Sequence, residues 1–167
     1  MLCFRLALAL LIAAAGGCGY QLTSSSPISL PEGMTRLYLE EVKNPTTEAW
    51  LEPSLRSALR DEFSRRGRIA WVDREQAEGL VRVNIEQYTA SAKLEDAREQ
   101  TIKSEVRLRI RGSIFRSRDH QLVWQSNTVL ATESFVGPKE GQDRREAERR
   151  VVDLAVEKLA DELGQGF

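Results

Sequence analysis

Apolar and polar residues alternate strictly between Glu105 and Phe115, and this is the clearest pattern in the chain. One side of the pattern holds Val106, Leu108, Ile110, Gly112 and Ile114, and the other holds Arg107, Arg109, Arg111 and Ser113. Successive side chains of a strand point to opposite faces of a sheet. The segment is therefore predicted to be a strand with one face in the core and the other in water.

Other segments show the same period of two. The strand predicted over residues 36–42 has Leu37, Leu39 and Val42 as its inward positions. A longer strand is predicted over 80–91, with Val81, Val83, Ile85 and Gln87 on one face and Arg82, Asn84, Glu86 and Tyr88 on the other. Weaker patterns predict an extended piece over 68–72, a charged loop over 92–100, a hairpin turn over 117–120 and a bulged strand over 122–135.

Two segments have helical spacing. The first holds Leu51, Leu55, Ala58, Leu59 and Phe63, and the second holds Ala147, Val151, Ala155, Leu159 and Leu163. The first helix is predicted to begin near Glu52, because Pro53 is tolerated only in a first turn. Its end is predicted at Gly67, which favours a left-handed cap. The second helix is predicted over 143–163, and a single helical turn over 73–78.

The order of these elements is strand, helix, three or four strands and helix, which we write as β-α-β-β-β-α. One crossover helix and a meander favour the α+β class. We predict two helices packed on one face of a mixed, mainly antiparallel sheet of about four strands. Residues 32–167 are long enough for one domain with its own core.

The first residues have the features of an export signal. Arg5 precedes a short apolar run over residues 6–15, which is too short to cross a bilayer, and small residues follow. Ala15-Gly-Gly-Cys18 resembles a bacterial lipobox, which implies removal of residues 1–17 and lipid attachment at Cys18 as N-acyl (palmitate) and S-diacylglycerol groups. Residues 18–31 are serine-rich and are predicted to be a lipidated N-terminus and short tether. Gly19, in place of Asp, implies sorting to the outer membrane.

Charge and cysteine content narrow the possible functions. The formal net charge is −1, so the chain has no overall attraction for nucleic acid, and no nucleic-acid partner is predicted. Cys3 leaves with the predicted signal, so the mature chain has no second cysteine for an internal disulfide.

The sequence gives little support for catalysis. His120 is the one histidine and falls in the predicted hairpin turn, without a second histidine or a spare cysteine for a metal site or a catalytic pair. No glycine-rich phosphate loop follows a strand. We therefore expect no enzyme activity, no cofactor and no metal.

Basic residues provide the candidate binding sites. Arg107, Arg109 and Arg111 share the outward face of one predicted strand. They are either the solvated face of an antiparallel sheet or a contact surface for a partner with acidic or phosphate groups. The predicted topology also places Lys43, Arg98, Lys103 and Lys139 at one pole, which suits a phosphorylated amphipathic ligand.

Several motifs together resemble one known family. They are Cys18-Gly-Tyr-Gln-Leu22, Leu30-Pro-Glu-Gly-Met34, Leu55-x-x-Ala-Leu59 and Arg66-Gly67. These residues, with the order of elements, resemble the LptE family of outer-membrane lipopolysaccharide-assembly lipoproteins. The resemblance implies two helices on a four-stranded sheet and no enzyme activity.

The resemblance also implies partners and a location. A protein of this family would be lipid-anchored in the inner leaflet of the outer membrane, on the periplasmic side. It would plug the LptD β-barrel, assist its assembly, and take part in lipopolysaccharide transport to the outer leaflet. The alternative is an outer-membrane lipoprotein that activates a periplasmic cell-wall enzyme, but the short tether counts against so long a reach.

Overall fold

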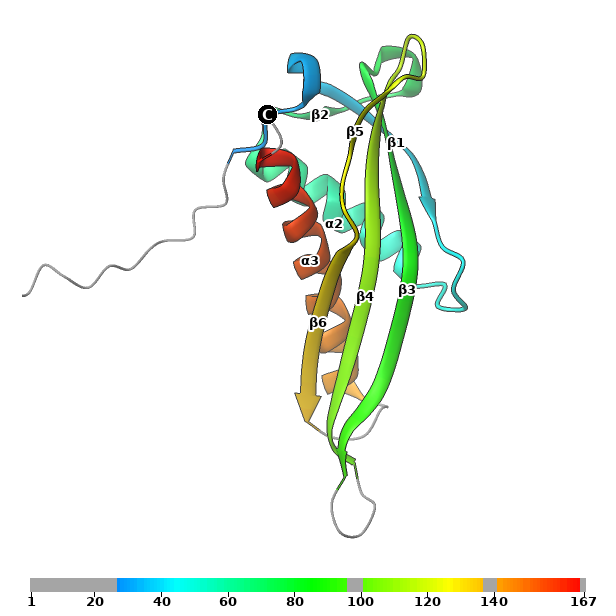
Figure 1. The fold of residues 1–167 in the computed structure, drawn as a ribbon, viewed down its shortest axis with the longest axis vertical. Coiled ribbons are helices and arrows are strands. Elements are labelled where there is room, and N and C mark those ends of the chain that lie inside the picture. The colour runs from blue at the N-terminus through cyan, green and yellow to red at the C-terminus, as the bar shows by residue number, and fades with distance from the viewer. Residues whose placement is uncertain (1–26, 96–100, 137–140, 166–167) are drawn as a thin grey trace, which may run out of the picture.

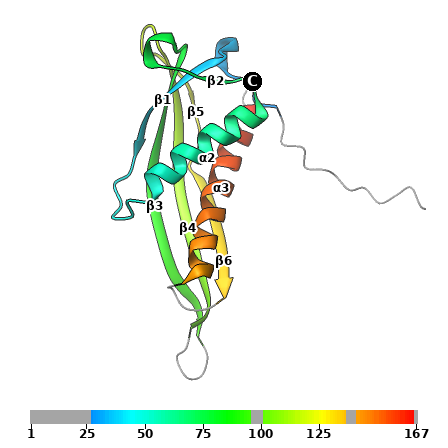
Figure 2. The ribbon, with the colours of Figure 1, turned by 180° about the vertical axis from the view of Figure 1, so that it is seen from behind.

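In the part of the chain that the structure describes, two α-helices lie across one face of a curved six-stranded sheet (Figure 1). The computed structural model describes residues 27–95, 101–136 and 141–165. In chain order the elements are η2 (Pro31–Gly33), β1 (Arg36–Lys43), α2 (Leu51–Arg66), β2 (Ala70–Trp71), η3 (Arg74–Gln76), β3 (Gly79–Glu95), β4 (Thr101–Arg116), β5 (Leu122–Gln125), β6 (Val129–Val136) and α3 (Gln142–Gln165). Figure 2 shows α2 running diagonally over the sheet, with α3 beside β4 and β6.

The sheet is mixed, with the order β2-β1-β3-β4-β5, and β6 also pairs with β4. β1 is parallel to β2 and to β3, while the other pairs are antiparallel. The predicted α+β class with both helices on one face is confirmed. The predicted count of about four, mainly antiparallel, strands is wrong, because the sheet gains the two-residue strand β2 and the last predicted strand is divided in two.

Ser126 explains the division between β5 and β6. Its backbone N–H donates to the carbonyl of Gly112 at 3.0 Å, and its Oγ accepts the Gly112 N–H at 2.9 Å. A side chain thus replaces one backbone partner of β4, so the regular ladder stops at this residue. β5 pairs with the upper part of β4 (Ser113–Phe115), and β6 pairs with its lower part (Lys103–Ile110).

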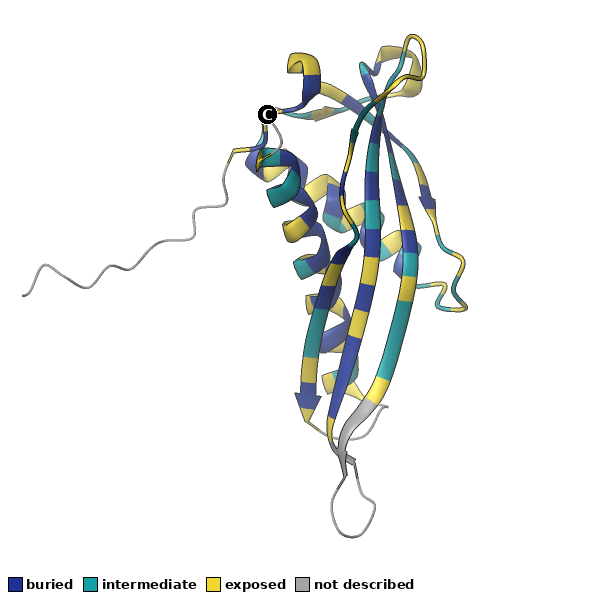
Figure 3. Cartoon of the chain, viewed as in Figure 1, coloured by how far each residue is buried: buried dark blue, intermediate teal, exposed yellow. Residues whose placement is uncertain are grey.

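The core lies between the sheet and the helices. Leu108, Ile110 and Ile114 on β4 are fully buried, as their alternation predicted, and Figure 3 shows buried and exposed residues alternating along this strand. Gly112 belongs to the same row. A Cβ atom at Gly112 would lie 2.9 Å from Leu159 Cδ1, so glycine lets α3 approach the strand closely.

The helices are where the sequence predicts them, but one predicted cap is wrong. α2 begins at Leu51, after an N-cap residue, Trp50, that makes no side-chain capping bond. Gly67 has φ −129° and ψ 165°, which is extended rather than left-handed. Its N–H still bonds to Phe63 O at 3.0 Å, and the chain then continues in an extended path toward β2.

The hairpin of β3 and β4 is longer than predicted, and its register shifts at three places along β3. Residues 92–95 continue β3 instead of opening a loop, because strand pairing needs no apolar face. The register shifts between Ile85 and Gln87, which turns Gln87 to solvent and Tyr88 toward the helices. The Tyr88 ring packs edge-on against Trp50 with 5.5 Å between centroids, and its hydroxyl donates to Glu148 at 2.7 Å. The predicted faces of this strand are therefore correct as far as Glu86 and wrong for Gln87 and Tyr88.

Candidate functional site

The face of the sheet that the helices leave uncovered carries the predicted row of arginines. Arg107 and Arg109 are exposed on β4, and Arg111 is half-buried. Arg109 lies between Gln87 on β3 and Leu130 on β6, and Arg107 lies between two threonines, one on each neighbouring strand. The row is a polar surface at the centre of the sheet, and its role in binding a partner stays a prediction.

Acidic neighbours neutralise two of the three arginines. Arg107 Nε lies 2.5 Å from Glu105 Oε1, and the Glu105 side chain is only 4% exposed. Arg111 Nη2 lies 3.1 Å from Glu86 Oε1 and donates to Thr128 Oγ1 at 2.8 Å. Arg109 makes no ion pair with any described residue. Its guanidinium is therefore the member of the row most available to an anionic partner.

The predicted basic pole does not form around Lys43. Lys43 is level with Asn84 on β3, whereas Lys103 is level with Leu94. Asn84 and Leu94 are ten positions apart, which corresponds to roughly 33 Å of strand. The prediction failed because β1 ends halfway along β3, while the β3–β4 hairpin continues. Lys103 is exposed near the hairpin end, and Arg98 and Lys139 lie outside the described residues.

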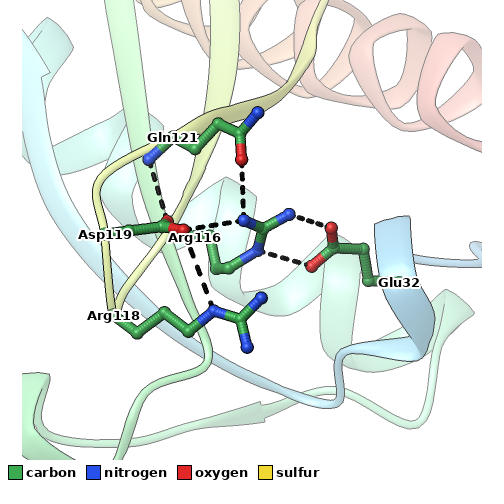
Figure 4. A network of polar contacts seen from close by, with 5 residues as sticks. All are labelled: Glu32, Arg116, Arg118, Asp119 and Gln121. Atoms are coloured by element: carbon green, nitrogen blue, oxygen red, sulfur yellow. Dashed lines mark hydrogen bonds and ion pairs between the residues drawn. The ribbon is translucent and has the colours of Figure 1, made fainter.

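At the opposite end of the sheet, Arg116 is the centre of a polar network (Figure 4). Its Nε donates to Glu32 Oε2 at 2.7 Å, and Nη2 forms an ion pair with the same carboxylate. Its Nη1 donates to Asp119 Oδ2 at 2.8 Å and to Gln121 Oε1 at 2.7 Å. We call this network the Arg116 clamp, and it ties η2 to the turn between β4 and β5.

Backbone conformation and charge both support the clamp. Glu32 has φ 57°, a left-handed conformation that a non-glycine residue adopts only when its surroundings hold it. The hydrogen bond from Arg116 lowers the pKa of Glu32. Nearby, the carboxylate of Glu78 accepts the backbone N–H groups of Thr35 at 2.8 Å and of Arg36 at 3.1 Å, which lowers the pKa of Glu78.

Acid is therefore expected to loosen this end of the domain before the core. Because the pKa of Glu78 is lower in the folded chain than its usual 4.5, its stabilisation is present above pH 4.5 and is lost as the pH falls through the folded value. Amide hydrogen exchange at Thr35 and Arg36, followed from pH 6 downward and corrected for intrinsic rates, measures this loss. Glu78→Gln is the control and should remove most of the pH dependence. Equal pH dependence in both chains would contradict this role for Glu78.

A groove of about 590 Å³ lies between α2 and α3. Trp50, Ala58 and Val152 are among its apolar lining residues, and both acidic and basic side chains also line it. Burial raises the pKa of Asp153, one of the acidic lining residues. The mixed charge of this groove indicates no particular ligand.

The described residues contain no grouping suited to metal or histidine chemistry. No set of three or more His, Cys, Asp or Glu side chains in them is placed to hold a metal ion. His120 is exposed at the β4–β5 turn with φ 57°, as a turn residue. None of the described helices has the length and apolar character needed to cross a bilayer.

These features define a class of protein, a sheet domain covered by helices on one face and polar on the other. Its fold is similar to an uncharacterized lipoprotein B from Nitrosomonas europaea, with a TM-score of 0.59, 14% identity, and coverage of 87% of this chain and 90% of that one. It is also similar to a putative lipoprotein from Caulobacter crescentus, with a TM-score of 0.51, 12% identity, and coverage of 77% and 89%. At these identities the likeness concerns the fold alone.

A family model described as "LptE: Lipopolysaccharide-assembly" matches residues 34–163. The chain therefore belongs to the LptE family, a non-enzymatic family of lipopolysaccharide-assembly lipoproteins, and the family predicted from the sequence motifs is confirmed. A comparison with curated proteins finds no match. Sequence reasoning found the arginine row but missed the Arg116 clamp, although Pro31-Glu-Gly33 and the predicted turn over 117–120 lie on its two sides.

Proposed function

We propose that this protein is an outer-membrane lipoprotein, anchored through Cys18, that plugs an LptD-type β-barrel. In that position it assists assembly of the barrel and the transport of lipopolysaccharide to the outer leaflet. The observation that carries the proposal is the family match over residues 34–163, which spans nearly all of the described domain. Residues 1–17 are the proposed signal peptide and 18–31 the lipidated tether.

The character of the surface supports a position inside a wide barrel. The lumen of such a barrel is polar, so a plug needs a polar exterior. Among the described residues, the exposed large hydrophobic side chains are those of Leu122, Leu130 and Val136. The rest of the described exterior is mainly polar, as a plug requires. On the same outer surface as Leu130, Arg109 offers a guanidinium that forms no ion pair with a described residue.

The Arg116 clamp supports a fixed orientation at the membrane. Pro27 is nine positions after Cys18, and a chain of that length spans at most about 30–32 Å when fully extended. η2 begins four residues after Pro27, and Arg116 holds it against the β4–β5 turn. A lipid at Cys18 would keep this end near the periplasmic surface of the outer membrane and direct the β3–β4 hairpin away from it.

Contact with lipopolysaccharide is proposed through basic side chains, because lipid phosphates accept charge-assisted hydrogen bonds from lysine and arginine. Lys103 is exposed near the hairpin end, and Arg98 and Lys139 are proposed to act with it. Arg107, Arg109 and Arg111 are proposed as a partner surface, with Arg109 the most available of the three.

Affinity purification tests the barrel partner. The full-length chain with a C-terminal tag, extracted from membranes in mild detergent, should recover an LptD-type barrel in a near 1:1 ratio. The control is an unrelated outer-membrane lipoprotein with the same tag, which should not recover the barrel. If the cells contain the barrel and the tagged chain does not recover it, the proposal that this protein plugs the barrel is refuted.

A further inference from the structure

Strand β6 is an edge of the sheet. Among the described strands it pairs with β4 only, from Val129 opposite Ile110 to Val136 opposite Lys103. An edge strand presents a row of unpaired backbone N–H and C=O groups to whatever lies beside it. This edge runs along the lower half of the long sheet, beside α3 (Figure 1).

Two observations fix which backbone groups face outward. Lys158 Nζ donates to the carbonyl of Leu130 at 2.8 Å, which places this carbonyl on the free side of β6. On β4, Gly112 bonds toward Ser126, so Ile110, two residues earlier, directs its N–H and C=O toward its partner Val129. Groups of successive residues alternate in direction along an antiparallel strand. The residues that face outward are therefore Leu130, Thr132, Ser134 and Val136.

The same four residues place their side chains on the uncovered face of the sheet. Leu130 is 47% exposed and Val136 is 73% exposed, and Thr132 and Ser134 lie between them. The inward neighbours Val129, Ala131 and Phe135 are buried against α3. An incoming strand would thus meet apolar side chains at both ends and small hydroxyl side chains in the middle.

Protection of this edge is partial. Lysine at a sheet edge is one of the devices by which proteins prevent strand pairing, and Lys158 covers the upper end at Leu130. From Thr132 to Val136 no described residue bonds to the outward backbone groups. The backbone groups of this edge are open over Thr132–Val136, and the valine at its end is exposed. Both features favour a strand that docks a partner over an edge strand that only faces solvent.

We propose that β6 accepts an extended segment of the barrel partner as an additional strand along Thr132–Val136. Backbone hydrogen bonds would supply the pairing, and alternate apolar side chains of the segment would cover Leu130 and Val136. An acidic residue of the segment would complement Lys158 at the upper end. The identity of the partner rests on the proposed function, whereas the open edge does not.

A second copy of the chain fits this edge less well. Two identical edges related by a two-fold axis pair antiparallel, which would place the two N-terminal ends at opposite ends of the assembly. With eight residues between Cys18 and Pro27, both lipid anchors reach one membrane only if the two paired domains lie flat along it. A barrel segment makes no such demand on the tether, so it is the occupant that agrees with an anchored plug.

Hydrogen exchange on the purified full-length complex tests the proposal directly. The amides of Thr132, Ser134 and Val136 should exchange at least tenfold more slowly in the complex with the barrel than in the free lipoprotein, because they gain partners. The amides of Ala131 and Glu133 already bond to β4 and serve as internal controls, with much smaller changes. Equal exchange of the outward amides in both states would overturn the proposal.

A matched pair of variants separates the backbone from the side chain. Ser134→Pro removes an N–H that the fold does not use, and should reduce recovery of the barrel about tenfold. Ser134→Thr keeps the N–H and the hydroxyl and should recover the barrel normally. Unchanged recovery with a folded Ser134→Pro chain would refute the strand pairing. If that chain does not fold, the exchange measurement on the native complex decides.

The possible failures are distinguishable. If the native chain recovers no barrel at all, the proposed function is wrong. If the barrel is recovered and the outward amides stay unprotected, the strand pairing alone is wrong. Protection of these amides in the isolated lipoprotein that grows with its concentration would instead identify a second copy as the occupant, and would overturn the proposal.

Discussion

Leu108→Ala is expected to lower the free energy of unfolding by about 2–5 kcal/mol, which is the range for removing a buried leucine side chain from a core. Leu108 is fully buried in the middle of β4, with Tyr88 beside it on β3 and Ala131 on β6. Since strands flank it on both sides and helices cover it, the surrounding structure can collapse only partly into the space. Urea denaturation of the mature chain, with the midpoint and slope compared to the native protein, measures the loss.

Arg109→Ala is the matched control, one position along the same strand. Arg109 is exposed on the opposite face and makes no ion pair with a described residue, so its removal should change the free energy of unfolding by no more than about 0.5 kcal/mol. A larger loss for Arg109→Ala than for Leu108→Ala would show that the two faces of β4 are assigned the wrong way round.

β4 could be predicted from the sequence because its environment is simple. One face meets the helices along the row from Val106 to Ile114, and the other face meets water, so the composition alternates without interruption. The same holds for α3, where buried residues recur on one stripe and the remaining positions are polar. In both elements a single contact surface determines the residue types.

β3 shows where periodicity stops being sufficient. The bulge between Ile85 and Gln87 exchanges the two faces, and its consequence, the packing of Tyr88 on Trp50, depends on where α2 begins. No local residue in β3 specifies that contact. Likewise, the split at Ser126 depends on a hydrogen bond to Gly112, fourteen residues earlier.

The candidate sites divide in the same way. The arginine row lies on one strand, so alternation alone places its members together. The Arg116 clamp joins residues 84 positions apart in sequence, and only the tertiary fold brings them together. The predicted grouping of Lys43 with Lys103 is wrong for the opposite reason. It assumed strands of similar length, and β1 is much shorter than β3.

Removal of the lipid anchor is expected to have the largest effect on location. If residues 1–18 are replaced by a secretory signal cleaved before Gly19, the chain should leave the membrane fraction and appear in the soluble periplasm. One acyl chain binds a bilayer only marginally, at about 0.8 kcal/mol per buried methylene, but the three chains expected at Cys18 give stable attachment. Cell fractionation without a co-expressed barrel measures this change, since the barrel itself would hold the domain at the membrane.

The native chain provides the control and a second measurement. Its intact mass after membrane extraction should correspond to a chain that starts at Cys18 and carries diacylglycerol and acyl groups. An unmodified N-terminus would contradict the anchor, and with it the proposed orientation set by the tether and the Arg116 clamp. Membrane retention of the anchor-free chain without the barrel would instead mean that the domain binds lipid through its own surface. Arg109 and Lys103 are then the first residues to replace, because both side chains are exposed. Arg109 lies on the face of the sheet that the helices leave uncovered, and Lys103 lies near the end of the β3–β4 hairpin.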